Sequence, residues 1–409
     1  MSIAVVNGKV LNEDQQVSVR NLLIQGRHIS GIGYIPDEDE DQLRIIDVTQ
    51  GLLLPNTFDF FYIPEISNIK DYTLDLRQFG HMNVSYLPNP KSSLLDHPED
   101  IEKMAQILGD LRQHVSFVAC ASKGNLPDEL SELSLLVKAG ASAIYFDRII
   151  ENDVLFKQAL TYVDMIGVPI IFGPMTSMDK NGAHLNDGAT SFEIGIRGES
   201  EDDEFKNVQY ALSLIQSNVS VPVHFQCISS IRAIQLIHEF KKTHSNISLG
   251  ASPFHMVLSD DFLKTYSADL KFNPPLRSSE TMTHLFKALS DGMIDHFTAL
   301  HFPVLGDSQE KSFFDHPFGS ATIPYFFNLA SHCLIKSGCS LDQYDRLLSC
   351  PSHLNLFQSV QLNLKANASF IVLKTVAQTD HDIQLFNDIS IQLTGGVHAI
   401  FVNGDVYGI

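Results

Sequence analysis

The feature that most constrains the fold is an alternation of short apolar runs with longer amphipathic stretches through the middle of the chain. Helical patterns, such as residues 99–114 and 230–243, separate most of these runs. Eight strand–helix units predict an α/β protein with a (β/α)₈ TIM barrel, and no G-x-G-x-x-G follows a run to favour a doubly wound sheet instead. The eight predicted strands are residues 56–62, 82–87, 115–121, 142–146, 168–172, 221–227, 247–252 and 296–301.

Both ends of the chain have the pattern of β-strands. Apolar and polar residues alternate over 3–11 and 17–34, and again over 368–376, 389–395 and 397–402. Neither end has enough strands for a stable sheet of its own. We therefore expect residues 1–54 and 355–409 to pair into one small β-sandwich, beside a barrel of residues 55–354.

Charge and composition narrow the classes of partner. The formal net charge of −20 argues against binding to nucleic acid or to an anionic membrane surface. No apolar run approaches the roughly 20 residues that span a bilayer. The five cysteines lack C-x-x-C spacing, which excludes a zinc-finger pattern and a disulfide framework. These features predict a cytoplasmic protein.

One segment carries a specific resemblance. Residues 271–277 read Lys-Phe-Asn-Pro-Pro-Leu-Arg, and they follow Ser-Pro-Phe-His at 252–255 and precede Leu-Ser-Asp-Gly at 289–292. This ordered set resembles the dihydroorotase family of the amidohydrolases, with weaker matches that extend to both ends of the chain. The resemblance implies the same barrel and β-sandwich.

The family's metal ligands are missing at the matching positions. Dihydroorotases interconvert carbamoyl aspartate and dihydroorotate, and their zinc polarises the amide carbonyl and activates a water. The resemblance places the ligands at the ends of the first, fourth, fifth, sixth and eighth strands. Those positions hold Phe61, Ile63, Phe146 or Asp147, Gly173, Cys227 and Leu300. We therefore expect no metal cofactor, although Asp147, Cys227 or His301 could in principle rebuild a site.

The substrate side is partly retained. Asn89 and Asn273 match substrate-binding positions of the family, whereas its carboxylate-gripping arginine is replaced by Glu65. Arg277 is either a vestigial substrate ligand or a structural ion-pair partner. His81, His255 and His301 lie near strand ends, where a structural role is favoured over a new metal site.

Three functions remain open. The first is a non-catalytic homologue without catalytic residues that supports aspartate transcarbamoylase, a partner implied by the resemblance, as is a homodimer. The second is a metal-poor amidohydrolase acting on a cyclic amide such as dihydroorotate. The third is a sensor that binds a pyrimidine intermediate through Asn89, Asn273 and Arg277. The first predicts a pocket plugged by Phe61, Ile63, Phe146 and Leu300. The second predicts an open polar pocket with Asp147, Cys227, His255 and His301 as candidate groups.

Overall fold

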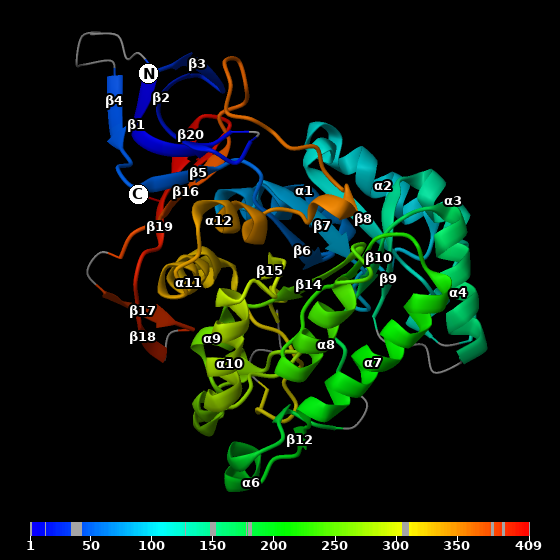
Figure 1. Ribbon diagram of the computed structural model, residues 1–409. Coiled ribbons are helices and arrows are strands. Elements are labelled where there is room, and N and C mark those ends of the chain that lie inside the picture. The colour runs from blue at the N-terminus through cyan, green and yellow to red at the C-terminus, as the bar shows by residue number, and fades with distance from the viewer. Residues whose placement is uncertain are drawn as a thin grey trace.

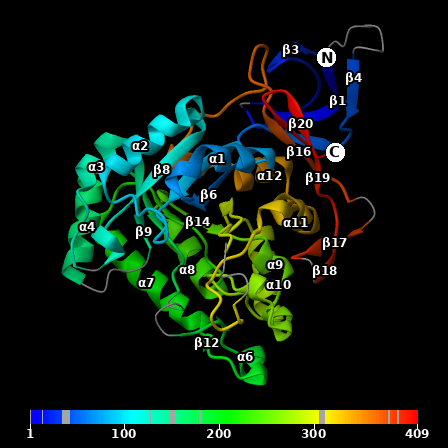
Figure 2. The same ribbon diagram turned by 180° about the vertical axis from the view of Figure 1, so that it is seen from behind.

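A computed structural model shows a barrel with a β-sheet region at one end (Figures 1 and 2). It describes residues 2–12, 14–33, 43–126, 128–147, 153–176, 178, 182–304, 311–377, 380–386 and 389–408. For residues 153, 217 and 218 only the backbone is described. Within these ranges, no helix combines the length and the apolar character needed to cross a bilayer.

The predicted barrel is confirmed. Its strands pair in sequence order and in parallel, and each corresponds to one predicted apolar run. They are β6 (Phe58–Tyr62), β7 (Asn83–Leu87), β8 (Val115–Cys120), β9 (Ala141–Phe146), β10 (Ile170–Phe172), β13 (Val223–Phe225), β14 (Ile247–Ala251) and β15 (His296–Phe297).

Side-chain hydrogen bonds join the first and last barrel strands. The His296 Nε2 atom lies 3.2 Å from the carbonyl oxygen of Phe58, and the amide of Ala299 donates to Asp59 Oδ2 at 2.6 Å. Asp59 is fully buried, and this burial raises its pKa to about 7 although backbone amides of Ala299 and Phe60 oppose the shift. The barrel therefore closes through a buried polar seam.

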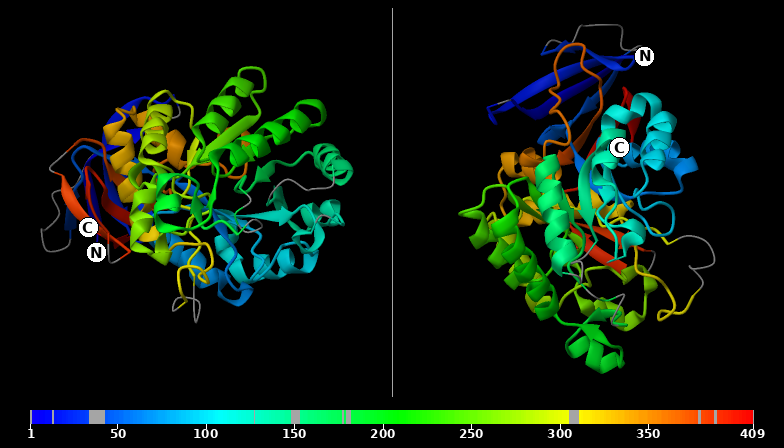
Figure 3. Two further views of the ribbon diagram at one scale, coloured as in Figure 1. Left: turned by 90° about the horizontal axis from the view of Figure 1, so that it is seen from below. Right: turned by 90° about the vertical axis from the view of Figure 1, so that its right-hand side faces the viewer.

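Helices surround the barrel strands (Figure 3). On α2 the buried residues Ile101, Met104 and Leu108 recur at helical spacing, which turns one apolar stripe toward the strands. The main helices are α1 (Ile69–Gln78), α2 (Pro98–Leu108), α3 (Leu133–Ala139), α4 (Asp153–Ile166), α7 (Glu201–Asn218), α8 (Ile231–Lys241), α10 (Ser279–Ser290), α11 (Ile323–Lys336) and α12 (Leu341–Leu348). The short elements α6 (Ala189–Ile194), α9 (Phe254–Val257), β11 (Leu185–Asn186) and β12 (Gly198–Glu199) lie in loops between them.

Strands from both chain ends share one sheet, as predicted. The order is β20-β19-β16-β5-β1-β2-β3, with β4 paired to β1, and the stacked rings of Phe370 and Phe401 lie in its own hydrophobic core. The strands are β1 (Ser2–Leu11), β2 (Val17–Gln25), β3 (His28–Ile32), β4 (Leu43–Asp47), β5 (Gly51–Leu54), β16 (Phe370–Lys374), β19 (Val397–Val402) and β20 (Asp405–Tyr407). A separate hairpin is formed by β17 (His381–Leu385) and β18 (Ile389–Leu393). The domain boundaries at 54/55 and 354/355 stay a prediction.

Candidate active-site pocket

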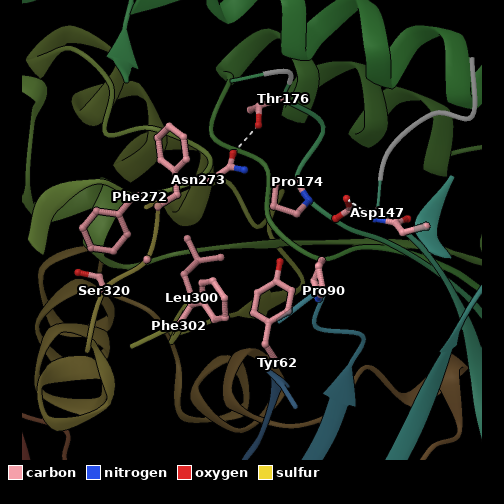
Figure 4. A pocket seen from close by; sticks show the side chains of 13 residues that line it. Tyr62, Pro90, Asp147, Pro174, Thr176, Phe272, Asn273, Leu300, Phe302 and Ser320 are labelled. Atoms are coloured by element: carbon pink, nitrogen blue, oxygen red, sulfur yellow. Dashed lines mark hydrogen bonds between the residues drawn. The ribbon is translucent and has the colours of Figure 1, made fainter. Parts of the chain in front are cut away.

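A cavity of about 230 Å³ lies at the carboxyl ends of the barrel strands (Figure 4). Its walls come from the end of β6 and from the loops after β7, β8, β9, β10, β14 and β15. In (β/α)₈ enzymes this face of the barrel holds the active site. The polar side chains on the walls are Tyr62, Asn125, Asp147, Thr176, Asn273 and Ser320.

Three of the four residues that we expected to plug the pocket do not line it. Phe61, Ile63 and Phe146 are buried in the hydrophobic core between strands and helices. The ring of Phe146, for example, packs 5.4 Å from that of Phe156 on α4. Successive side chains of a strand point to opposite faces, so Tyr62 is the β6 residue that reaches the pocket. Of the expected plugs, only Leu300 lines the cavity.

Gly173 and Cys227 also match metal-ligand positions of the family. The first has no room for a larger side chain, and the second keeps its thiol proton. At Gly173, a β-carbon would lie 2.9 Å from the carbonyl oxygen of Asp147 and would clash with the hydroxyl of Tyr145. Tyr145 therefore fills the space that a larger side chain would need. Cys227 is fully buried, and burial raises the pKa of its thiol well above the ordinary range, so it stays protonated.

The donors present among the described residues do not fit a zinc ion. No group of three or more His, Cys, Asp or Glu side chains within them is placed to hold a metal. His255 Nε2 lies 3.0 Å from the carbonyl oxygen of Pro274, and His301 Nδ1 accepts from the amide of Ile323 at 3.2 Å. Burial lowers the pKa of His255 to about 4 and that of His301 to about 3. Neither histidine lines the pocket, and neither does His81.

Asp147 is the carboxylate of the pocket. The sequence left Phe146 and Asp147 as alternatives at the end of the fourth strand, and the structure turns Asp147 toward the cavity. The amide of Asn125 donates to Asp147 Oδ2 at 2.9 Å, and the hydroxyl of Tyr145 donates to Oδ1 at 3.2 Å. These bonds fix the orientation of the carboxylate, as a general base requires.

Hydrogen-bond donors face the same cavity. The hydroxyl of Tyr62 points into it (Figure 4), and burial together with the charge of Asp147 raises the pKa of Tyr62. Tyr62 therefore keeps its proton at neutral pH. Thr176 donates its hydroxyl hydrogen to Asn273 Oδ1, which leaves the Asn273 amide nitrogen to donate into the pocket.

Two sequence-predicted substrate residues lie outside the pocket lining. Asn89 uses its side chain within its own loop, donating to the carbonyl oxygen of Ile63 at 2.7 Å. Arg277 is fully buried and donates to Glu204 Oε2 at 2.8 Å, so it forms the ion pair considered as the structural alternative. Asn273 is the member of the predicted trio that reaches the cavity.

Sequence reasoning missed Tyr62, Asn125 and Thr176. The resemblance directed attention to the positions that match metal ligands, and these three residues match none of them. A usable signal was their place, because each stands at or shortly after the end of a predicted strand.

Comparisons with known proteins agree with this fold. No family model matches the chain. The dihydroorotase of Endomicrobium trichonymphae is 30% identical over 263 residues, covering 63% of this chain and 61% of the relative. The chain thus spans less than two thirds of that relative's length. The dihydroorotase of Geobacillus kaustophilus is 24% identical over 346 residues, covering 83% of this chain and 80% of the relative.

Solved structures extend the comparison to the whole chain. A dihydropyrimidinase from Brevibacillus agri superimposes with a TM-score of 0.73 at 16% identity, covering 99% of this chain and 95% of that one. A D-hydantoinase from a Thermus species gives a TM-score of 0.72 at 16% identity, covering 99% and 94%. The chain therefore has the same fold as this dihydropyrimidinase and this D-hydantoinase. Relatives named dihydroorotase match 63–83% of this chain at 24–30% identity, which confirms the resemblance to that family.

The comparisons contradict the expectation of a pseudoenzyme. The sequence relatives are named as dihydroorotases, and the neighbours in fold are a dihydropyrimidinase and hydantoinases, which are enzymes. The expectation rested on the missing zinc ligands and on a filled pocket. Three of the four residues expected to fill it lie elsewhere, and a largely apolar cavity with the carboxylate of Asp147 on its wall stays open.

Proposed function

We propose that the protein is a divergent amidohydrolase that hydrolyses a cyclic amide, such as dihydroorotate, in the pocket at the carboxyl end of the barrel. The observation that carries this proposal is the oriented carboxylate of Asp147, which faces a cavity that also presents the hydroxyl of Tyr62 and the amide of Asn273. The names of the sequence relatives and of the neighbours in fold support the class of substrate.

The chain's own side chains suffice for a hydrolytic step. Asp147 accepts a proton from a water molecule, whose oxygen forms a bond to the amide carbon. Tyr62 and Asn273 donate hydrogen bonds to the carbonyl oxygen as it gains negative charge. When the C–N bond breaks, protonated Asp147 returns the proton to the ring nitrogen. The product is an open chain in which the former ring nitrogen carries the returned proton and the amide carbon has become a carboxylic acid. This acid releases its remaining proton to solvent, so one water is consumed and one proton is set free.

We propose further that this step needs no zinc. In the family the metal activates the water and polarises the carbonyl. Here the described donors do not fit zinc, and Asp147 with Tyr62 and Asn273 supply base and hydrogen-bond donors in the same pocket. The described walls of the pocket carry no positive charge to stabilise the developing oxyanion, so we expect slower turnover than a zinc-dependent reaction would give.

The test is hydrolysis of dihydroorotate, dihydrouracil and hydantoin by the purified chain, followed by chromatography, with and without a strong chelator. The proposal expects ring opening above the rate without protein and no loss of rate in the chelator. Background rates on all three rings would contradict the proposed function. A rate that the chelator abolishes and zinc restores would contradict the metal-free step.

Assembly with aspartate transcarbamoylase, homodimerisation and a cytoplasmic location stay predictions. The first two follow from the resemblance alone. Co-purification of the two proteins, with the molecular mass of the chain alone measured by light scattering, tests both. A single monomeric peak with no bound transcarbamoylase would contradict them.

A further inference from the structure

A second cavity, of about 460 Å³, lies at the amino-terminal ends of β6 and β7, at the opposite end of the barrel from the active-site pocket. Its walls come from the start of β7, from α12 (Figure 1) and from the segment 349–359 that follows this helix. The two cavities share no lining residue. A cavity of this size accommodates a small organic molecule.

Asn83 presents a buried amide group to this second cavity. In the parallel pairing of β6 with β7, Asn83 stands beside Phe58, which faces the barrel interior together with Leu87. Asn83 is only 8% exposed, and its side-chain amide forms no hydrogen bond with any residue that the structure describes. Buried amides normally have partners, so Asn83 has both a donor and an acceptor available for a ligand.

Charges of both signs on the same walls lack a counter-ion. Asp345 and Arg346 of α12 line the cavity, and neither forms an ion pair within the described part of the chain. Burial raises the pKa of Asp345, although hydrogen bonds from Ser349 and Gln15 oppose the shift. A second carboxylate, that of Asp342, also lines the cavity. A ligand that carries a positive and a negative group would therefore compensate the charges of these walls.

Apolar side chains complete the lining of the second cavity. The ring of Phe357 packs 5.5 Å from that of Phe58, at the amino-terminal end of the barrel interior, and Pro351 lines the same cavity. Phe357 is half-buried, so part of its ring is free for contact with a ligand. An apolar group placed against this ring would be removed from water, which favours binding.

We propose that this second cavity binds a free α-amino acid with an apolar side chain. The ammonium group of the ligand contacts the carboxylate of Asp345, and its carboxylate pairs with the guanidinium group of Arg346, whose planar fork can bind both oxygens. Asn83 supplies a further hydrogen bond, and the apolar side chain of the ligand covers Phe357. A ligand with a single charge leaves one of the two charged groups without a counter-ion. This inference goes beyond the proposed function, because the site lies at the other end of the barrel.

Calorimetric titration of the full chain with L-phenylalanine and two truncated analogues tests the site. Phenethylamine lacks the carboxylate of L-phenylalanine, and 3-phenylpropanoate lacks its ammonium group. We expect L-phenylalanine to bind about tenfold more tightly than either analogue, because each analogue loses one charge-assisted hydrogen bond. Equal affinity for the three compounds, or no saturable binding of L-phenylalanine, would overturn the proposal.

Two variants locate the binding in this cavity. Arg346→Met should weaken L-phenylalanine about tenfold and leave phenethylamine unchanged, whereas Asp345→Asn should weaken both and leave 3-phenylpropanoate unchanged. Arg44→Met, which removes an exposed arginine of β4, is the matched control and should change no affinity. Circular dichroism checks that each variant is folded. Unchanged affinity for L-phenylalanine in both cavity variants, or an equal effect of the control, would overturn the site. Hydrolysis enters neither measurement, so a failure of the proposed function leaves this test intact.

Discussion

Arg277 and Glu204 form a buried ion pair whose loss should be costly. Both side chains are completely buried, and the Arg277 guanidinium donates to Glu204 Oε2 at 2.8 Å. It also donates to Ser229 Oγ at 2.9 Å and to Asn186 Oδ1 at 3.0 Å. The pair thus connects the segment 271–277, which carries Asn273, to the first turn of α7.

Arg277→Met keeps much of the side-chain volume and removes the charge. The carboxylate of Glu204 then stays buried with hydrogen bonds from Ser229 and Ser230 but without its counter-ion. Breaking a buried pair in this way costs about 3–5 kcal/mol of unfolding free energy. We expect turnover to fall as well, because the segment that presents Asn273 to the pocket loses its anchor.

Urea denaturation followed by circular dichroism measures the cost. The matched control is Arg232→Met, which removes the exposed pair of Arg232 with Asp202, an α7 residue close to Glu204. Exposed pairs contribute about 0–1 kcal/mol, so this control should change little. If Arg277→Met lost less than about 1 kcal/mol, or no more than Arg232→Met, the buried-pair reasoning would be refuted.

Three further predictions concern the pocket and the buried titratable groups. Gly173→Ala should displace Tyr145 and lower the unfolding free energy by about 1–3 kcal/mol through overpacking. The control Gly188→Ala should be tolerated, because the nearest atom to its added β-carbon lies 3.5 Å away. Equal urea midpoints for the two variants would contradict this prediction. Tyr62→Phe should reduce turnover about tenfold or more while binding is retained, because only the transition state uses the lost donor; unchanged turnover would remove Tyr62 from the mechanism. The unfolding free energy should fall as the pH drops from about 6.5 toward 4. Burial lowers the pKa of His255 and His296 to about 4 and that of His301 to about 3. The folded protein therefore holds these histidines neutral at a pH where the unfolded chain already binds protons, and this difference favours unfolding as the pH falls. Each of these three histidines should lower the unfolding free energy by about 2 kcal/mol at pH 5. Asp59, whose pKa is raised to about 7, acts in the opposite direction, but the three histidines together outweigh it. Equal unfolding free energies at about pH 7.5 and pH 5 would contradict this prediction.

The barrel was predictable because its signal is local. Strands buried on both faces appear as continuous apolar runs, and each of the eight runs became a barrel strand. Pairing of the two chain ends was predicted because neither end alone has enough strands for a stable sheet.

The pocket was less predictable because it depends on which face of a strand each residue occupies. One residue of offset moves a side chain from the helix layer to the cavity, as Phe61 and Tyr62 show on β6. The partner of Arg277 lies 73 residues away in sequence, and no local pattern pairs them. Asn89 illustrates a third case, since a residue type suited to ligand binding was used to shape its own loop.

The central claim is that Asp147 drives amide hydrolysis in this pocket, and the direct test compares wild type with Asp147→Asn. Dihydroorotate ring opening is measured for both in the presence of a chelator, with Asp110→Asn at an exposed position as control. The account predicts a loss of about 10²–10⁴-fold in Asp147→Asn with unchanged folding, and no loss in the control. Equal rates in wild type and Asp147→Asn would contradict it.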